Sequence, residues 1–289
     1  MLAHIGPETA QTTALYGFAV SGLDGASQLL NAASTGWETW RVTSEIGSDA
    51  EISTRRPHGF MLGAVEAHVP ISLGVISVHR AAQRIDVLTR AAVPAADLVH
   101  PFLALPAAAI AHWNDDIPFH AGSYVDNSGR AWIVVGPRGT GKSTTMAALL
   151  EGGAPILCDD VAVLRGEEVL AGPRCIDLRG DAGARYQDAV PLGLVGTRER
   201  WRLPCPPVQR SYPLAGFVSL DWGDAISAKR LHQRATLPQI IAAQTLALRP
   251  RSPQRMLELA SLPFFHVTRP RRIELLPQLV DLLRDLPDA

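Results

Sequence analysis

The stretch that decides the fold is Gly136-Pro137-Arg138-Gly139-Thr140-Gly141-Lys142-Ser143, which matches the pattern G-x-x-x-x-G-K-[ST]. The apolar run 132–135 precedes it, and a segment with helical spacing, 143–151, follows it. Glycines let successive backbone N–H groups turn inward around phosphate oxygens, along a path that a Cβ would obstruct. The pattern therefore predicts a strand, a phosphate-binding loop and a helix in that order, as in an ATP- or GTP-binding α/β domain.

The residues that close this loop have separate chemical roles. A helix that starts at Lys142 directs its unpaired N–H groups and the positive end of its dipole at the bound anion. Lys142 supplies a positive charge for the β- and γ-phosphates, and the Ser143 hydroxyl is a Mg²⁺ ligand. Arg138, inside the loop, is expected either to help neutralise the polyphosphate or to face solvent. We therefore predict that ATP and Mg²⁺ bind at residues 136–144, which include Thr144.

Two carboxylates, Asp159-Asp160, directly follow the next apolar strand, 155–158. Neighbouring side chains of a strand point to opposite faces, so the two are expected to divide their roles. One of them would face Mg²⁺ and the other an acceptor hydroxyl, from which a carboxylate can take a proton. The same dipeptide elsewhere is usually a solvated turn. Its position after the strand that follows the loop and its helix favours the functional interpretation.

The remainder of the chain divides into two parts. Short alternating runs punctuated by glycine predict a small β-rich accessory or substrate domain over 1–95, with strands at 16–20, 37–43, 60–65, 71–78 and 84–89. The nucleotide-binding domain is expected over 96–289. It would open with a helix at 97–113, capped by Asp97 and kinked or broken at Pro106.

Within the second part, the strand before the loop has an antiparallel partner next to it in sequence. Runs 119–125 and 131–135 flank the turn Asp126-Asn127-Ser128-Gly129, which predicts a hairpin that leads into the loop. Further strands are predicted at 156–158, 161–164, 169–171 and 217–220, and further helices at 238–248 and 277–286.

Composition excludes some classes of partner. The formal net charge is −1, with 47% hydrophobic and 19% charged residues, so no nucleic-acid partner and no anionic membrane surface is expected. The most apolar run, 98–111, contains two prolines and is shorter than the ~20 residues of a membrane span. The N-terminus shows no export signal. Three cysteines without a CxxC pair, Cys158, Cys175 and Cys205, favour a reducing, cytoplasmic setting.

Taken in order, three segments resemble the bacterial HPr kinase/phosphorylase family. They are His120-Ala121-Gly122, the loop 136–143, and Cys158-Asp159-Asp160-Val161. That family shares its nucleotide fold with the phosphoenolpyruvate carboxykinases, and the resemblance covers about residues 117–180. It implies an α/β, P-loop core of this type behind the small β-rich N-terminal domain, and it implies a homo-oligomer.

The resemblance also implies roles for individual residues. Asp159 would be the base that activates the acceptor hydroxyl, with His120 beside it, and Asp160 would hold the metal together with Ser143. Cys175-Ile176-Asp177-Leu178-Arg179-Gly180 is similar to the family's L-E-I-R-G signature. Asp177 then stands in place of a metal-side Glu, one methylene shorter, so that contact through water is an alternative. Arg179 keeps the basic catalytic position.

The chain departs from the family at both ends. Its N-terminal region shows no likeness to that of the family, and the C-terminal phosphorylase motif is not found, so phosphorylation of HPr does not follow. The chain is more similar to divergent kinases that accompany ribosomally made peptides. We therefore expect a Mg·ATP-dependent kinase acting on a hydroxyl, such as a serine of a peptide or protein. The alternatives are a small-molecule hydroxyl kinase, a regulatory ATP-binding module without phosphoryl transfer, and a carboxykinase-like activity.

A second basic feature lies further along the chain. Arg198, Arg200 and Arg202 alternate around Trp201. In a strand they would share one face, where they could hold a phosphate or an acceptor carboxylate, although an ordinary solvated face explains them equally well. Other arginines flank the predicted C-terminal helices, where oligomer contacts or solvation account for them: Arg249, Arg251, Arg255, Arg269, Arg271 and Arg272.

Overall fold

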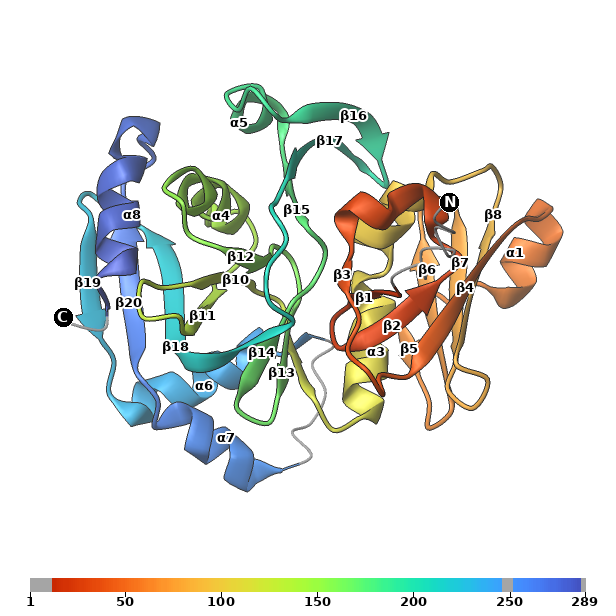
Figure 1. Ribbon diagram of the computed structural model, residues 1–289, viewed down its shortest axis with the longest axis horizontal. Helices are drawn as coiled ribbons and strands as arrows, with labels where there is room; N and C mark the ends of the chain where they lie inside the picture. The colour runs from red at the N-terminus through yellow and green to blue at the C-terminus, as the bar shows by residue number, and fades with distance from the viewer. Residues whose placement is uncertain (1–11, 246–251, 287–289) are drawn as a thin grey trace, which may run out of the picture.

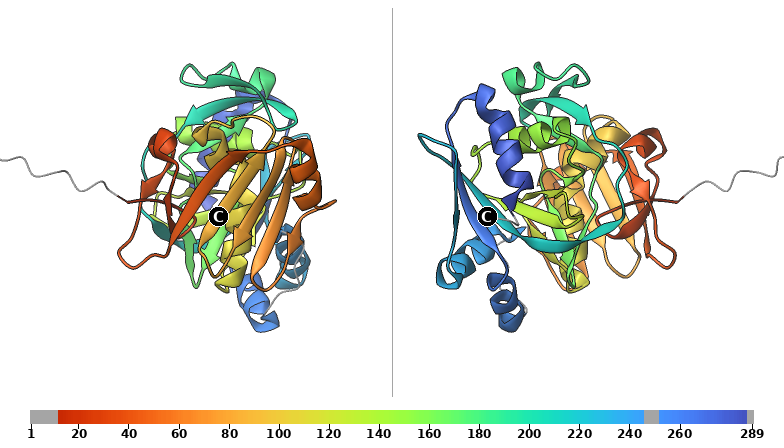
Figure 2. Two further views of the ribbon diagram at one scale, coloured as in Figure 1. Left: turned by 90° about the vertical axis from the view of Figure 1, so that its right-hand side faces the viewer. Right: turned by 60° about the vertical axis from the view of Figure 1, so that its left-hand side comes forward.

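The computed structural model describes residues 12–245 and 252–286, which form a mixed α/β fold. The first part of the chain is an eight-stranded sheet with the order β3-β1-β2-β4-β8-β7-β6-β5. Figure 1 shows this sheet at one side of the molecule, and the left view of Figure 2 looks onto its outer face. Its strands are β1 (Thr13–Leu15), β2 (Phe18–Ser21), β3 (Asn31–Ala32), β4 (Thr39–Ile46), β5 (Met61–Leu62), β6 (Glu66–Ile71), β7 (Gly74–His79) and β8 (Arg84–Thr89).

Two of the strands predicted here are wrong because they cross turns. Tyr16 and Gly17 have φ of 51° and 86°, so the predicted strand 16–20 begins in the turn between β1 and β2. The predicted strand 71–78 crosses the hairpin of β6 and β7. Alternation alone does not reveal such turns when the turn residues are apolar. Two short helices complete this part, η1 (Asp24–Leu29) and α1 (Asp49–Arg55).

The helical segment after the first sheet is broken, but not at the predicted proline. It consists of α2 (Ala95–Asp97), the π-helical turn η2 (Leu98–Phe102) and α3 (Ala104–Trp113). The break falls at His100, whose φ and ψ of −147° and 126° are extended, as expected for a residue before proline. Pro106 instead lies in the first turn of α3, where no N–H is needed. Asp97 makes no side-chain cap; Pro94 stands at the N-cap of α2.

No single helix of the described residues is long and apolar enough to cross a bilayer. Only the pair 95–102 and 104–113, bent by 59°, satisfies length and composition together. Most of α3 is buried in the protein core, where it contacts β6 of the first sheet and β9 (Ile117–Phe119) of the second.

The second sheet carries the elements around the glycine-rich loop. Its path is β12-β10-β11-β18-β14-β13-β9, and β20 pairs with β18 and β19. The strands are β10 (Gly122–Val125), β11 (Ala131–Val135), β12 (Ile156–Cys158), β13 (Ala162–Arg165), β14 (Glu168–Leu170), β18 (Ser211–Trp222), β19 (Ser227–Arg230) and β20 (Phe264–Arg269). The predicted hairpin of β10 and β11 is confirmed as antiparallel. The predicted strand 119–125 is divided at His120, because β9 pairs with β13 whereas β10 pairs with β11 and β12.

A three-stranded sheet, β15-β17-β16, lies in Figure 1 between α4 (Lys142–Glu151) and the first sheet. It contains β15 (Cys175–Leu178), β16 (Val190–Val195) and β17 (Arg198–Pro204), and α5 (Gly180–Gly183) follows β15. The remaining helices are α4 (Lys142–Glu151), α6 (Gln233–Ala243), α7 (Pro253–Ala260), η4 (Ile273–Leu275) and α8 (Leu276–Arg284). The end of the predicted helix 238–248, with Arg249 and Arg251 after it, lies outside the described residues.

One hydrophobic cluster joins the two large sheets, from Leu15 of β1 to Phe264 of β20. Polar contacts reinforce this junction. Arg165 Nη1 of β13 donates to the Gly17 carbonyl at 3.3 Å, and the Tyr16 N–H donates to the Ala171 carbonyl at 2.7 Å. The division of the chain into domains 1–95 and 96–289 stays a prediction.

Candidate active site

The glycine-rich loop leaves the sheet where three parallel strands end together. β11 runs parallel to β18, and β18 runs parallel to β20, so their carboxyl ends meet at one edge. The loop follows β11 directly and leads into α4, which is the predicted order of strand, loop and helix. Gly136, Gly139 and Gly141 have φ of 146°, 91° and 84°, in the region that residues with a Cβ rarely adopt. Glycine is therefore a conformational requirement at these loop positions.

Lys142 folds back over the loop that precedes it. Its Nζ donates to the carbonyl of Gly136 at 2.7 Å and lies 3.4 Å from that of Pro137. Burial lowers the pKa of this ammonium, while Asp160 and Asp159 nearby raise it. The positive charge is therefore held at the loop by neutral carbonyls, which a phosphate oxygen can replace as its partners.

A cavity of about 320 Å³ opens beside the loop and gathers most of the predicted residues. Those that line it are Arg138, Gly139, Gly141, Lys142, Ser143, Thr144, His120, Asp159, Asp160, Asp177 and Arg179. Gly136, Pro137 and Thr140 belong to the loop but do not line the cavity. Arg198 and Arg200 of β17 line it as well, together with Leu178 and Ala182. The lining also includes His100 and Trp222, which the sequence did not indicate. No local motif marks His100 or Trp222, because the fold brings each of them to the cavity from a segment that is distant in sequence from the glycine-rich loop.

Asp159 is the buried member of the aspartate pair. Its Oδ2 accepts the backbone N–H of Asp177 at 3.3 Å, and its Oδ1 is buried without a hydrogen-bond partner among the described residues. Burial, together with the charge of Asp160, raises the pKa of this carboxyl to about 7, although the Ser143 side chain and the Asp177 N–H act in the opposite direction. A carboxyl with a pKa near neutrality, beside an anion-binding loop, has the proton affinity of a general base.

Asp160 points into a more open environment; both aspartates lie in a bend directly after β12, which ends at Cys158. The Asp160 side chain is 41% exposed, and its Oδ1 lies 3.3 Å from Nδ1 of His120. The same nitrogen is 3.2 Å from the Asp160 carbonyl. His120 stands between β9 and β10, and its ring contacts the carboxylate of Asp160. His120 and Asp159 line the same cavity, and the expected role of His120 beside Asp159 stays a prediction. In this arrangement His120 orients Asp160.

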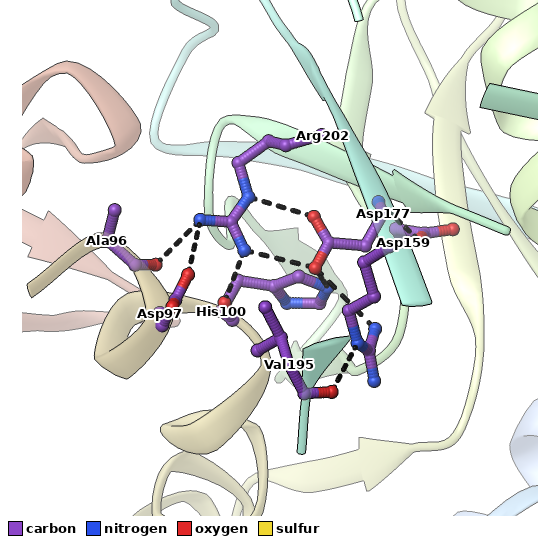
Figure 3. Close-up of polar contacts among 8 residues, drawn as sticks. Ala96, Asp97, His100, Asp159, Asp177, Val195 and Arg202 are labelled. Atoms are coloured by element: carbon purple, nitrogen blue, oxygen red, sulfur yellow. Dashed lines mark hydrogen bonds and ion pairs between the residues drawn. The ribbon is translucent and has the colours of Figure 1, made fainter. Parts of the chain in front are cut away.

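Asp177 is buried, and its carboxylate is bound by arginines (Figure 3). Arg202 Nε donates to Oδ1 at 2.8 Å and Arg202 Nη2 to Oδ2 at 3.0 Å, while Arg200 Nη1 lies 3.5 Å from Oδ2. His100 Nε2 lies 3.8 Å from the same oxygen. Burial lowers the pKa of His100, which favours the neutral ring. Both oxygens of Asp177 thus have cationic partners, a geometry that supports a structural ion pair more than metal ligation; its role as a ligand stays a prediction.

The lining of the cavity also contains a group of positive charges. Arg198 and Arg200 project from β17 and Arg179 follows β15, so the expected alternation on one strand face brings two of the three β17 arginines to the cavity. The third, Arg202, is buried behind them. Partial burial and repulsion from Arg138, Arg179 and Arg200 lower the pKa of Arg198. Such an arrangement attracts an anion.

The donors fit a metal that arrives with a nucleotide. Among residues 12–245 and 252–286, no group of three or more His, Cys, Asp or Glu could hold an ion by itself. Mg²⁺ at phosphate sites is typically bound by one or two protein side chains together with phosphate oxygens and waters. The Ser143 hydroxyl, the exposed Asp160 carboxylate and the unpartnered Oδ1 of Asp159 match that requirement.

Comparison with known proteins finds a distant structural similarity. No protein-family model matches the sequence, and no curated protein matches it. Among solved structures, the Hpr(Ser) kinase/phosphatase from Coxiella burnetii is similar over 59% of this chain and 95% of that chain, with 13% sequence identity and a TM-score of 0.32. At this score the similarity is distant and carries no argument, so the function has to be inferred from the site.

Proposed function

We propose that the chain is a Mg·ATP-dependent kinase that transfers the γ-phosphoryl group to a hydroxyl, such as a serine of a peptide or protein. One observation carries the proposal. Asp159, a buried carboxyl with a pKa of about 7 and an unpartnered oxygen, lines the same cavity as the glycine-rich loop. A phosphate cradle beside a proton acceptor is what phosphoryl transfer to an alcohol requires.

Each residue then has a defined task. The loop amides and Lys142 would bind the phosphates, while Ser143 and Asp160, oriented by His120, would hold Mg²⁺. The bound metal would neutralise charge on the phosphates. Asp159 would take the proton of the acceptor hydroxyl as the acceptor oxygen bonds to the γ-phosphorus and the bond to the β–γ bridging oxygen breaks. Arg179 would stabilise the charge that develops on the transferred group.

The nature of the acceptor and of the surroundings belongs to this proposal as well. Arg179, Arg198 and Arg200 line the same cavity, where they would attract an anionic group of the acceptor or of the nucleotide. Three buried cysteines without a disulfide suit a reducing, cytoplasmic compartment. A homo-oligomer, and the absence of nucleic-acid and membrane partners, stay predictions. The carboxykinase-like alternative needs additional metal ligands, and no residue of the described site favours it.

The test is a transfer assay with γ-labelled ATP, Mg²⁺ and a host lysate divided into small-molecule, peptide and protein fractions. Asp159→Asn removes the base, and Asp281→Asn on the exposed face of α8 is its matched control. We expect label in the peptide or protein fraction with the wild type and the control, and none with Asp159→Asn. Label in the small-molecule fraction would identify the other kinase class. Tight ATP binding without transfer in any fraction would favour the regulatory module, and unaltered transfer by Asp159→Asn would refute the assigned base.

A further inference from the structure

A buried cation stands directly behind the glycine-rich loop. Arg269, the last residue of β20, is 4% exposed, and no carboxylate of the described residues pairs with it. Its Nε is buried without a hydrogen-bond partner. Its guanidinium carbon lies 4.2 Å from the centroid of the Trp222 ring. A buried charge without a counterion is costly, so an arginine in this position needs a physical explanation.

The contacts of Arg269 lead to the loop. Its Nη2 lies 3.4 Å from the Gly141 carbonyl and 3.5 Å from that of Thr140. Trp222 Nε1 donates to the Gly139 carbonyl at 3.2 Å. Trp222 and Arg269 are register partners at the ends of the parallel strands β18 and β20. Two neighbouring strand ends therefore brace three consecutive carbonyls of the loop from one side.

This brace determines where the loop amides point. In a planar trans peptide the carbonyl of one residue and the N–H of the next are directed oppositely. Holding the carbonyls of Thr140 and Gly141 toward Arg269 turns the N–H groups of Gly141 and Lys142 away from it. Gly141 and Lys142 line the cavity, whereas Arg269 does not. The guanidinium thus lies on one side of the loop and the amides on the other.

We infer that Arg269 is a positioning residue for the nucleotide: it orients the loop amides and supplies a buried positive charge that a bound polyphosphate compensates. The inference rests on the proposed nucleotide binding and goes beyond the residues that touch the ligand. Burial lowers the pKa of Arg269 to about 10, so the charge persists at neutral pH. Without ligand this charge destabilises the folded chain, and with ligand it contributes to affinity.

The inference predicts opposite effects on stability and on binding. Arg269→Met keeps the length and apolar packing of the side chain but removes the charge and the contacts to the loop carbonyls. We expect the melting temperature of the free protein to stay equal or rise, and the Kd for ATP and for inorganic tripolyphosphate to increase at least tenfold. Arg269→Lys, which keeps the charge, should recover part of the affinity, and the Kd of Arg269→Met should depend less on salt.

The matched control is Arg271→Met. Arg271 is exposed, and its guanidinium carbon lies 4.9 Å from the centroid of the same Trp222 ring, but it has no described contact with the loop carbonyls. This variant should bind both probes within twofold of the wild type. Calorimetric titration and thermal unfolding of the full chain supply the readouts.

Two results would overturn the inference. One is binding of both probes by Arg269→Met within twofold of the wild type. The other is a combination of two results: the melting temperature of Arg269→Met falls below that of the wild type, and Arg269→Lys recovers none of the affinity. That combination would indicate a purely structural side chain. If the wild type itself bound tripolyphosphate but not ATP, the kinase proposal would fail while the role of Arg269 would still be measured. If the wild type bound neither probe, both would fail.

Discussion

The guanidinium of Arg202 binds both oxygens of the Asp177 carboxylate, with Nε 2.8 Å from Oδ1 and Nη2 3.0 Å from Oδ2. The same guanidinium also donates to the Ala96 carbonyl at 2.9 Å and to the His100 carbonyl at 2.5 Å. One buried ion pair therefore joins β15, β17 and the helical segment after the first sheet (Figure 3). Asp177 and Arg200 both line the cavity, so this junction holds part of the cavity lining in place.

Removing Arg202 should destabilise the chain strongly. Arg202→Met leaves the carboxylate of Asp177 buried without its main partner, which typically costs about 3–5 kcal/mol of unfolding free energy. The control is Arg198→Met on the same strand, because the Arg198 side chain has no ion-pair partner among the described residues. This variant should lose less than about 0.5 kcal/mol of unfolding free energy. The double variant Asp177→Asn/Arg202→Met should recover part of the loss. Urea unfolding at pH 7 measures all three, and equal losses in the two single variants would contradict the assignment.

Asp159→Asn should stabilise the protein while it abolishes transfer. Asp159 has a pKa of about 7 in the folded chain against an ordinary 3.8, so the folded state holds a proton that the unfolded state releases between these values. The wild type therefore loses stability as pH rises from about 4 to about 7, in total by about 4 kcal/mol from the size of the shift. Asparagine avoids this cost and can still accept the N–H of Asp177.

Thermal unfolding without nucleotide at two pH values tests the predicted stabilisation by Asp159→Asn. The melting temperature of Asp159→Asn should match that of the wild type near pH 4 and exceed it at pH 8. Asp281→Asn, at an exposed position, should follow the wild type at both. A lower melting temperature for Asp159→Asn at pH 8 would show that the buried carboxylate is compensated by its surroundings.

The pH dependence of catalysis should reflect the same group. A general base must be ionised to accept the hydroxyl proton, so kcat/KM for Mg·ATP at saturating acceptor should fall tenfold per pH unit below about 7. Above that value it should level off. Steady-state rates between pH 5 and 9 measure the profile. An activity that is flat from pH 5 to 8 would exclude Asp159 as the base.

Two loop glycines should respond differently to the same substitution. A Cβ at Gly141 would lie 2.0 Å from Nη2 of the buried Arg269, whereas a Cβ at Gly139 would meet nothing within 4 Å. Both residues have positive φ, so backbone strain should destabilise each alanine variant by about 1 kcal/mol or more. Gly141→Ala should also displace Arg269 and weaken ATP binding by at least a further tenfold. Calorimetric titration compares the two, and equal losses would mean that strain alone limits the loop.

Local sequence patterns predicted the elements around the site correctly. The strand at 131–135, the helix after Gly141 and the hairpin of β10 and β11 depend on residues close in sequence, and the structure contains all three. The expected separation of Asp159 and Asp160 is also present, with one carboxylate buried and the other 41% exposed, although both lie in the bend after β12 and not in the strand itself. These features could be predicted because a glycine conformation, a strand period or a helix start is determined over a few residues.

Only the tertiary structure decided which distant side chains meet. His120 contacts Asp160 because the chain breaks between β9 and β10 and changes its pairing partner there. Asp177 meets Arg202 because β15 pairs with β17, and Arg269 reaches the loop because β20 lies parallel to β18. No local pattern encodes these neighbours. They result from the order of the strands in each sheet and from the energetic cost of burying an unpaired charge. Both are properties of the whole fold.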